Sequence, residues 1–239
     1  MRILAFETSA KAACVALWDG QTLLGESYQN TGLTHSQTLL SMAESMLSHC
    51  GFTAQDVDAV AVAAGPGSFT GVRIGVAAAK GFAWGRELPC YGVSTLEAMA
   101  LNLGIHEGII CPVMDARRNQ VYNALFQAEH GTLTRLQPDR AIALSDLAAE
   151  LKNYTQPVFL VGDGSLLCYN TLKEHVPNLI LPPPHRMHQR AAGVALVAQA
   201  MIDAGLPGDG ATLVPNYLRL SRLSGSAWPG NKKDKGEKL

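Results

Sequence analysis

The residues with the clearest chemical potential form one glycine-rich run, Gly65-Pro66-Gly67-Ser68-Phe69-Thr70-Gly71-Val72-Arg73. The run follows an apolar stretch typical of a buried strand and precedes a stretch typical of a helix. A turn of this kind gathers backbone N–H groups at the positive end of a helix, which favours an anion or a closely approaching partner. The pattern therefore predicts either a phosphate loop or the entry to a docking helix.

The spacing of these glycines differs from two common nucleotide-binding patterns. Gly65, Gly67 and Gly71 span one residue more than the dinucleotide pattern, and the run lacks the Gly-Lys-Ser or Gly-Lys-Thr end of a P-loop. Glu7 ends the first apolar stretch, and we favour a capping or strand-end role for it over catalysis. The residues alone do not predict an ATP site of either common kind.

Side chains that bind metals are scattered along the chain. His185 and His188 form the closest histidine pair, but no third ligand lies near them in the sequence, so surface or helix-end positions are favoured. His35 is interpreted as a polar residue in a first helical turn rather than a base. The cysteines are odd in number and include no Cys-x-x-Cys pair, which indicates reduced thiols: Cys14, Cys50, Cys90, Cys111 and Cys168. We therefore predict no metal site and no disulfide frame.

The composition indicates a globular chain without a strong charge. Its 239 residues are 47% hydrophobic and carry a formal net charge of −1, so nothing draws the whole chain toward nucleic acid. No apolar run reaches the roughly 18 residues of a membrane span, and no signal peptide precedes the first predicted strand. We expect a cytoplasmic protein with no membrane contact and a disordered tail at residues 223–239.

The first half of the chain alternates between strand and helix patterns. Asp19-Gly20 is a strong hairpin signal, and Ser94 or Thr95 with Glu97 predicts a capping box at a helix start. The predicted strands and helices of this half are, in order, residues 2–7, 12–18, 22–28, 34–50 (helix), 59–64, 70–84 (helix) and 90–93.

A second α/β block begins near residue 109. Two strands, 109–114 and 120–127, are joined by a turn at 115–119, and a long stretch without a predicted element follows. A strand at 158–161 then leads through Gly162-Asp163-Gly164 into a helix, and an alanine-rich helix spans 191–204. We predict an N-terminal lobe at residues 1–107 and a C-terminal lobe at residues 108–222, with the last helix able to pack back on the first lobe.

The order of these elements predicts a fold class. Three antiparallel strands, a helix, a parallel strand and further helices, followed by a second α/β block, predict the two-lobed α/β fold of actin-like ATPases, sugar kinases and Hsp70, which is ribonuclease H-like. Six motifs narrow this class, because together and in this order they resemble the bacterial TsaB (YeaZ) family: residues 3–9, 34–37, 65–73, 92–96, 115–118 and 215–219. The resemblance is strong over residues 1 to about 125 and thins to isolated motifs beyond.

The resemblance implies a role in tRNA processing. Members of the family help to form threonylcarbamoyladenosine at adenosine 37 of tRNAs that read codons beginning with A. They heterodimerise with the threonylcarbamoyl transferase TsaD and activate it, in an assembly with the ATPase TsaE, and tRNA is reached through the complex. Two alternatives remain open: a small-molecule kinase of the sugar-kinase type, and a regulatory homodimer.

The resemblance also bears on catalysis. ATP-using members of the wider fold carry an Asp-x-Gly phosphate turn where this chain reads Glu7-Thr8-Ser9-Ala10, and TsaD carries a histidine pair where this chain reads 94–100 without histidine. We therefore expect a non-catalytic partner that binds no cofactor alone. ATP or ADP at the junction with TsaD would be contacted by Glu7, Thr8, Gly65, Gly67 and Ser68.

The two helices nearest the glycine run predict a contact surface. In the 70–84 helix only Arg73 and Lys80 are charged, and Gly71, Gly75 and Ala79 form a row of small residues. A helix this apolar on every side needs cover on more than one side, so we favour an interface over simple core packing. Family members pair through these helices. The predicted interface residues are His35, Leu39, Met42, Met46, Phe69, Gly71, Val72, Arg73, Gly75, Val76, Ala79 and Lys80.

The second block offers two further candidates. Arg117 and Arg118, followed by Tyr122, could reach a phosphate or a tRNA backbone. An exposed salt bridge between Asp115 and Arg117 is at least as strongly favoured. The turn at 162–164 resembles a nucleotide-contacting turn of the wider fold, but a structural role is favoured.

Overall fold

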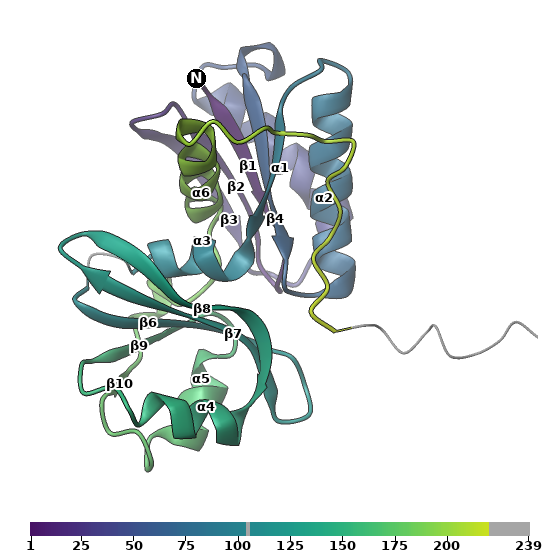
Figure 1. The fold of residues 1–239 in the computed structure, drawn as a ribbon. Coiled ribbons are helices and arrows are strands. Elements are labelled where there is room, and N and C mark those ends of the chain that lie inside the picture. Colours follow the sequence, from purple (N-terminus) through teal and green to yellow (C-terminus); the bar gives the residue numbers. More distant parts are fainter. Residues whose placement is uncertain (104–105, 220–239) are drawn as a thin grey trace, which may run out of the picture.

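Two lobes, each built on a five-stranded mixed sheet, make up the computed structural model, which describes residues 1–103 and 106–219 (Figure 1). The strands of the first sheet lie in the order β3-β2-β1-β4-β5. β1 pairs antiparallel with β2 and parallel with β4. The five strands are β1 (Ile3–Glu7), β2 (Ala13–Trp18), β3 (Leu23–Gln29), β4 (Ala59–Gly65) and β5 (Cys90–Ser94).

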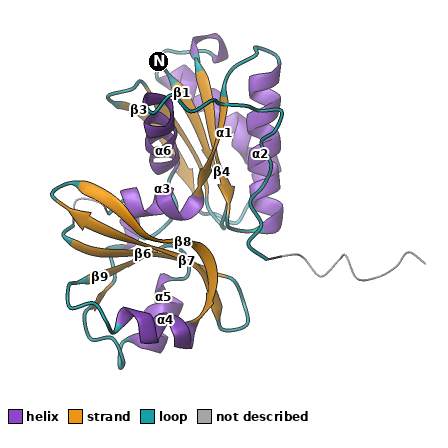
Figure 2. Cartoon of the chain, viewed as in Figure 1, coloured by secondary structure: helices purple, strands orange, loops and turns teal. Residues whose placement is uncertain are grey.

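Helices cover both faces of the first sheet. Because successive side chains of a strand point to opposite faces, Leu4 and Phe6 of β1 face one helical layer and Ile3 and Ala5 face the other. The first layer holds α1 (His35–His49) and α2 (Phe69–Trp84). The second layer holds α3 (Thr95–Leu101) and α6 (Ala191–Asp203), so the last helix packs on the first lobe (Figure 2).

The second sheet lies beneath α3, which separates the two sheets. Leu96 and Met99 of α3 pack against Ile110 and Phe126 of this sheet, and α4 and α5 cover its other face. The strand order is β10-β9-β6-β7-β8. The elements are β6 (Gly108–Asp115), β7 (Gln120–Glu129), β8 (Thr132–Ala143), α4 (Leu144–Leu151), β9 (Val158–Val161), α5 (Ser165–Leu172) and β10 (Leu179–Ile180).

The predicted strands and helices are present, with small shifts at their ends, but β8, α4 and β10 were not predicted. β8 is an edge strand whose residues are exposed or half-buried, so its sequence lacks the apolar alternation that marks a half-buried strand. Short 3-10 turns also occur at Ala54–Asp56 and Pro184–Arg186. No helix within the described ranges is long and apolar enough to span a bilayer.

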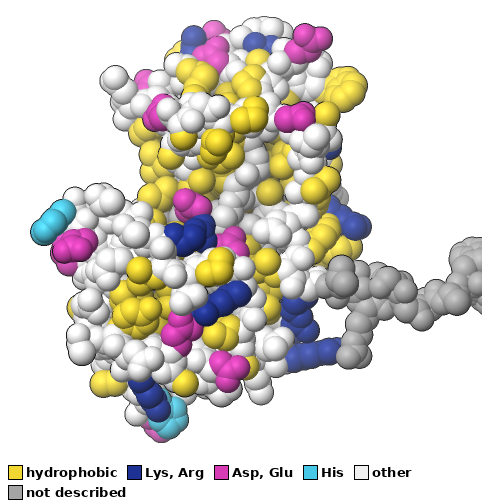
Figure 3. Space-filling model, in the orientation of Figure 1, with side chains coloured by type: hydrophobic (Ala, Val, Ile, Leu, Met, Phe, Trp, Pro, Cys, Tyr) yellow, Lys and Arg dark blue, Asp and Glu magenta, His cyan; other side chains and the backbone are white. Residues whose placement is uncertain are grey.

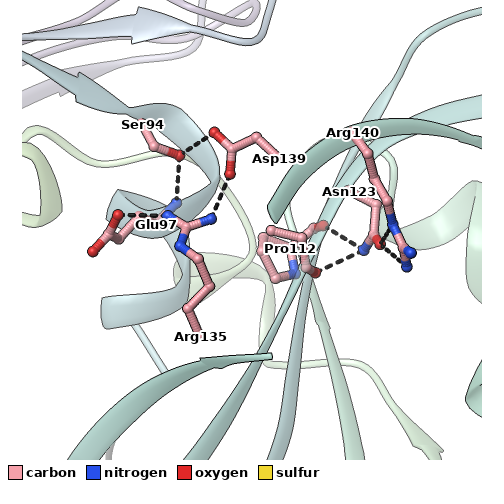
Figure 4. Close-up of polar contacts among 8 residues, drawn as sticks. Ser94, Glu97, Pro112, Asn123, Arg135, Asp139 and Arg140 are labelled. Atoms are coloured by element: carbon pink, nitrogen blue, oxygen red, sulfur yellow. Dashed lines mark hydrogen bonds and ion pairs between the residues drawn. The ribbon is translucent and has the colours of Figure 1, made fainter. Parts of the chain in front are cut away.

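A polar network joins the two lobes at α3 and β8 (Figure 4). Ser94 Oγ donates to Asp139 over 2.5 Å and accepts from the Glu97 backbone N–H over 3.2 Å. Arg135 of β8 pairs with Asp139 at 2.7 Å and with Glu97 at 2.5 Å. The Ser94 half of the predicted capping box is therefore present, whereas the Glu97 carboxylate binds across the lobe boundary.

The chain after α6 continues along the first lobe as an extended segment, residues 205–219, which we call the strap. It crosses the top of the first sheet and then follows α2 (Figure 1). Lys80 of α2 donates to the carbonyl oxygens of Ala211 and Leu213 over 3.3 and 3.1 Å. The backbone N–H of Asn216 donates to Ala64 O over 2.7 Å. The tail predicted at residues 223–239 lies outside the described residues.

Candidate docking face and interlobe cleft

A cleft with a volume of about 780 Å³ lies between the lobes. The first lobe contributes the β1–β2 loop and the glycine run, and the second lobe contributes the β6–β7 turn and Asp163. Tyr217 and Arg219 of the strap complete the wall. Figure 3 shows Lys and Arg side chains gathered where the second lobe meets the lower end of α2.

Glu7 lies beneath the floor of this cleft and is 1% exposed. Its Oε1 accepts a hydrogen bond from the backbone N–H of Ser9 over 2.6 Å. Burial raises the pKa of the Glu7 carboxyl to about 7; the hydrogen bonds from Ser9 oppose this rise, and the charge of Asp163 adds to it. The prediction that Glu7 caps the end of its strand is confirmed.

The glycine run closes tightly onto the β1–β2 loop. A Cβ atom on Gly67 would lie 2.5 Å from Ser9 O, and the Ser68 N–H donates to that oxygen over 2.6 Å. Ser68 Oγ accepts from the Gly71 N–H over 3.3 Å and so caps α2. The run therefore uses these N–H groups within the chain, and only Gly67 and Ser68 of the predicted nucleotide loop line the cleft.

The remaining residues predicted for that loop are enclosed by the chain. Thr8 is fully buried, and its Oγ1 donates to Gly71 O over 2.8 Å. Gly65 has a φ of +119°, which favours glycine, and a Cβ atom there would lie 2.5 Å from Asn216 O. Glu7, Thr8 and Gly65, which were predicted to contact a nucleotide at the TsaD junction, are enclosed in this chain by β1, α2 and the strap.

The row of small residues on α2 faces the first sheet instead of solvent. A Cβ atom on Gly71 would lie 2.1 Å from Thr8 O, so these glycines allow α2 to approach the end of β1. Eight of the predicted interface residues are buried within this chain, as the core alternative expects: Leu39, Met42, Met46, Gly71, Val72, Gly75, Val76 and Ala79. His35 is likewise engaged within the chain, since its Nε2 lies 2.8 Å from Ala10 O.

The other three predicted interface residues contact the strap. Lys80 binds strap carbonyls, as described above. The Arg73 guanidinium lies 3.8 Å from the centre of the Phe69 ring, and its Nε donates to Tyr217 Oη over 2.7 Å. The rings of Phe69 and Tyr217 lie 5.1 Å apart. Arg73 and Phe69 remain exposed, so this cluster stays accessible at the edge of the cleft.

A different apolar surface lies on the outer sides of α1 and α2, and we call it the docking face: Leu40, Ala77, Gly81, Phe82 and Trp84. Trp84 is 79% exposed and Leu40 is 54% exposed. Leu40 and Phe82 also line a cavity of about 480 Å³ between α1 and α2. The sequence analysis did not single out these positions, although the spacing of 77, 81 and 84 marks the helix face opposite the buried one.

The β6–β7 turn forms the second-lobe wall of the cleft. Arg117, Arg118 and Asn119 have φ values of +65°, +57° and +56°, so three consecutive non-glycine residues are left-handed. Arg117 pairs with Asp115 at 3.1 Å, which confirms the favoured salt bridge. Arg219 of the strap donates to Ala116 O over 2.6 Å and fixes the strap to this turn.

Asp163 projects from the turn after β9 at the other side of the cleft. Its Oδ1 accepts from Gln189 Nε2 over 3.2 Å. Although the residue reaches solvent, the protein atoms around it raise the pKa of its carboxyl, and the hydrogen bond from Gln189 opposes this rise. Within residues 1–103 and 106–219, no three His, Cys, Asp or Glu side chains lie close enough to hold a metal ion.

Comparison with known proteins identifies the family. The chain is 35% identical to the "tRNA threonylcarbamoyladenosine biosynthesis protein TsaB" of Bacillus subtilis over 92% of its own length and 95% of that protein. The chain belongs to the TsaB (YeaZ) family. The family model described as "TsaD: tRNA N6-adenosine threonylcarbamoyltransferase" also matches residues 29–223, which relates TsaB to that transferase.

Solved structures agree with this assignment. YeaZ from Pseudomonas aeruginosa superimposes with a TM-score of 0.74 and 26% identity, covering 91% of this chain and 99% of that one. A ROK hexokinase from Thermus thermophilus superimposes with a TM-score of 0.51 at 12% identity, covering 85% of this chain and all of that one, and so supports the fold alone. The predicted two-lobed actin-like and sugar-kinase fold is confirmed.

Proposed function

We propose that this chain is a non-catalytic subunit that heterodimerises with the threonylcarbamoyl transferase TsaD and activates it. Its family gives the chain a role in threonylcarbamoyladenosine formation in tRNA. The modified position would be adenosine 37 of tRNAs that read codons beginning with A. The ATPase TsaE would join the assembly, and the reaction would take place in the cytoplasm.

The observation that carries this proposal is the docking face. Leu40 and Trp84 are large exposed apolar side chains, and Ala77 and Gly81 are small exposed residues on the α2 face that carries Trp84, where a helix could approach closely. Large aromatic side chains at the centre of a contact commonly supply much of its binding energy. The match to the TsaD family model supports a pseudo-symmetric pairing in which equivalent helices of the transferase pack on α1 and α2.

The enclosed glycine run supports a non-catalytic role. Glu7 is bound to the Ser9 backbone, and the Ser68 N–H is bound to Ser9 O, so these groups are not free to grip a phosphate. We propose that ATP or ADP is bound only at the junction with TsaD, where Gly67 and Ser68 would form the first-lobe edge. Calorimetry with Mg-ATP on the isolated chain tests this point, because micromolar binding would favour the sugar-kinase alternative.

Reconstitution tests the whole proposal. TsaD, TsaE and substrate tRNA are combined with and without this chain, and threonylcarbamoyladenosine is measured in digested tRNA. We expect modification only when the chain is present, together with co-elution of the chain and TsaD in size-exclusion chromatography. Modification by this chain without TsaD, or full modification by TsaD without it, would contradict the proposal.

Self-pairing is the second candidate, because the docking face is equally available to another copy. A homodimer through this face would be the state of the isolated chain, and TsaD would replace one copy. Sedimentation of the chain at increasing TsaD concentration distinguishes the two candidates. Conversion of the homodimer into a complex with TsaD supports the heterodimer. A homodimer that persists in the presence of TsaD favours an independent regulatory role.

A further inference from the structure

The interlobe cleft has a positive wall that the docking proposal does not use. Its cationic lining residues are Lys11, Arg117, Arg118 and Arg219, against two carboxylates, Asp115 and Asp163. The chain as a whole carries a net charge of −1, so this concentration of cations is local. A concave, locally positive surface favours an anionic ligand.

The two arginines of the β6–β7 turn have strained backbone conformations. Left-handed conformations are unfavourable for residues other than glycine, and here they occur at Arg117, Arg118 and Asn119 in succession. The turn is fixed on both sides, because the Arg117 N–H donates to Asp115 over 2.7 Å and Asn119 O accepts from the Leu144 N–H over 3.0 Å. Strained, fixed conformations of this kind concentrate at ligand-binding sites.

Aromatic side chains are interleaved with the cations. Phe69, Tyr122 and Tyr217 line the same cleft as Lys11 and Arg118. Binding sites for single-stranded nucleic acids combine a positive groove with aromatic rings on which unpaired bases stack. The volume of about 780 Å³ lies within the range of about 300–1,000 Å³ that ligand pockets occupy.

We propose that the interlobe cleft binds a single-stranded segment of RNA. Phosphates contact Lys11 and Arg118, and an unpaired base stacks on Tyr122. The choice of RNA rests on the proposed function in tRNA modification. The RNA lies in the cleft between Lys11 and the second-lobe wall, whereas the nucleotide proposed at the TsaD junction belongs to Gly67 and Ser68 at the first-lobe edge.

Fluorescence anisotropy with the full chain and a labelled single-stranded RNA oligomer tests the proposal. Arg118→Glu is compared with Lys173→Glu, which makes the same charge change at an exposed site on the far end of α5. We expect Arg118→Glu to weaken binding about tenfold and to lower the salt slope by about 1, with little change for Lys173→Glu. Equal affinities and slopes for the two variants would overturn the proposal.

Arg118→Gly separates ligand binding from folding. Glycine adopts the left-handed conformation without strain, so we expect a higher melting temperature together with the same loss of RNA affinity. Tyr122→Leu removes the stacking ring and is expected to weaken binding about tenfold. Unchanged RNA affinity in Arg118→Gly would count against the site.

Three competitors define the ligand. We expect unlabelled single-stranded RNA to displace the probe, and we expect an RNA duplex of the same sequence and AMP at equal nucleotide concentration to fail. Displacement by AMP would assign the cleft to free mononucleotides and overturn the RNA proposal. None of these outcomes changes co-elution with TsaD, so failure here is distinguishable from failure of the proposed function.

Discussion

Gly75 of α2 and Thr8 at the end of β1 are in such close contact that a Cβ atom on Gly75 would lie 2.4 Å from Thr8 Oγ1. Gly81, six residues further along the same helix, has no atom of another element within 4 Å of the equivalent position. The two glycines therefore differ in what they do. Gly75 allows the helix to seat on its own sheet, whereas Gly81 leaves space on the docking face.

Substitution of these two glycines by alanine should have opposite effects. Gly75→Ala forces Thr8 or α2 to move, and we expect the free energy of unfolding to fall by about 1–3 kcal/mol. Gly81→Ala meets no atom and gains helix propensity, so we expect a rise of about 0.5–1 kcal/mol. Urea denaturation of the isolated chain measures both. A Gly75→Ala protein as stable as wild type would show that the packing of α2 on β1 is looser than described.

Trp84 should be important for binding TsaD but not for folding. The side chain is 79% exposed in the isolated chain, so Trp84→Ala should change the free energy of unfolding by less than about 0.5 kcal/mol. If Trp84 lies at the centre of the contact with TsaD, loss of its side chain should weaken binding by about 2 kcal/mol, or roughly thirtyfold in the dissociation constant. Calorimetric titration with TsaD measures the affinity. Ile180→Ala is the matched control, because Ile180 is an exposed apolar residue of the second lobe.

Glu7 should make the stability of the first lobe depend on pH. Its folded pKa is raised from 4.5 to about 7, so the folded state favours the protonated carboxyl. The contribution to stability is fully present below pH 4.5, is lost as pH rises toward 7, and stays constant above. A shift of this size corresponds to at most about 3 kcal/mol.

Glu7→Gln tests this expectation, because glutamine retains an oxygen for the Ser9 N–H and does not titrate. We expect wild type to lose stability relative to Glu7→Gln between pH 5 and pH 8. Chemical denaturation of both proteins at pH 5 and pH 8 gives four free energies of unfolding. The change with pH in wild type minus the change in Glu7→Gln isolates Glu7, because the other titrating groups contribute equally to both proteins. An equal pH dependence in the two proteins would mean that Glu7 is ionised in the folded state at pH 5.

Arg135 should control the rigidity of the lobe boundary. It pairs with Glu97 of the first lobe and with Asp139 beside it, and its guanidinium lies 4.6 Å from the centre of the Phe126 ring. Arg135→Leu retains apolar contact but removes both ion pairs, and we expect a loss of about 1–2 kcal/mol with faster hydrogen exchange in α3 and β8.

Arg140→Leu is the control for this prediction. Arg140 donates to Asn123 over 3.1 Å (Figure 4). It also pairs with Glu150 at 2.5 Å, so its partners all lie within the second lobe. We expect it to destabilise that lobe and to leave exchange in α3 unchanged. Equal exchange patterns in the two variants would contradict the role of Arg135 as a bridge between lobes.

The sequence predicted the fold class because its strands and helices carry strong apolar patterns, such as the continuous apolar run of β4 and the alanine-rich stretch of α6. It failed at β8, where an edge strand with Thr132 and Thr134 in solvent has no apolar alternation. The site was harder to predict. The row of Gly71 and Gly75 indicates a close approach, but the sequence does not say whether the approaching surface is another protein or the end of β1. Which surface packs against the glycines depends on the strap and on β1, and both are distant from α2 in the sequence.

The route of the strap has a consequence for synthesis of the protein on the ribosome. α6 and the strap complete the first lobe, yet both follow the whole second lobe in the sequence. A nascent chain can therefore finish its second lobe while one face of the first sheet and one flank of α2 are still uncovered. The N-terminal half must wait, partly assembled, until translation has passed residue 219, and only then does it acquire the shape that another subunit would meet.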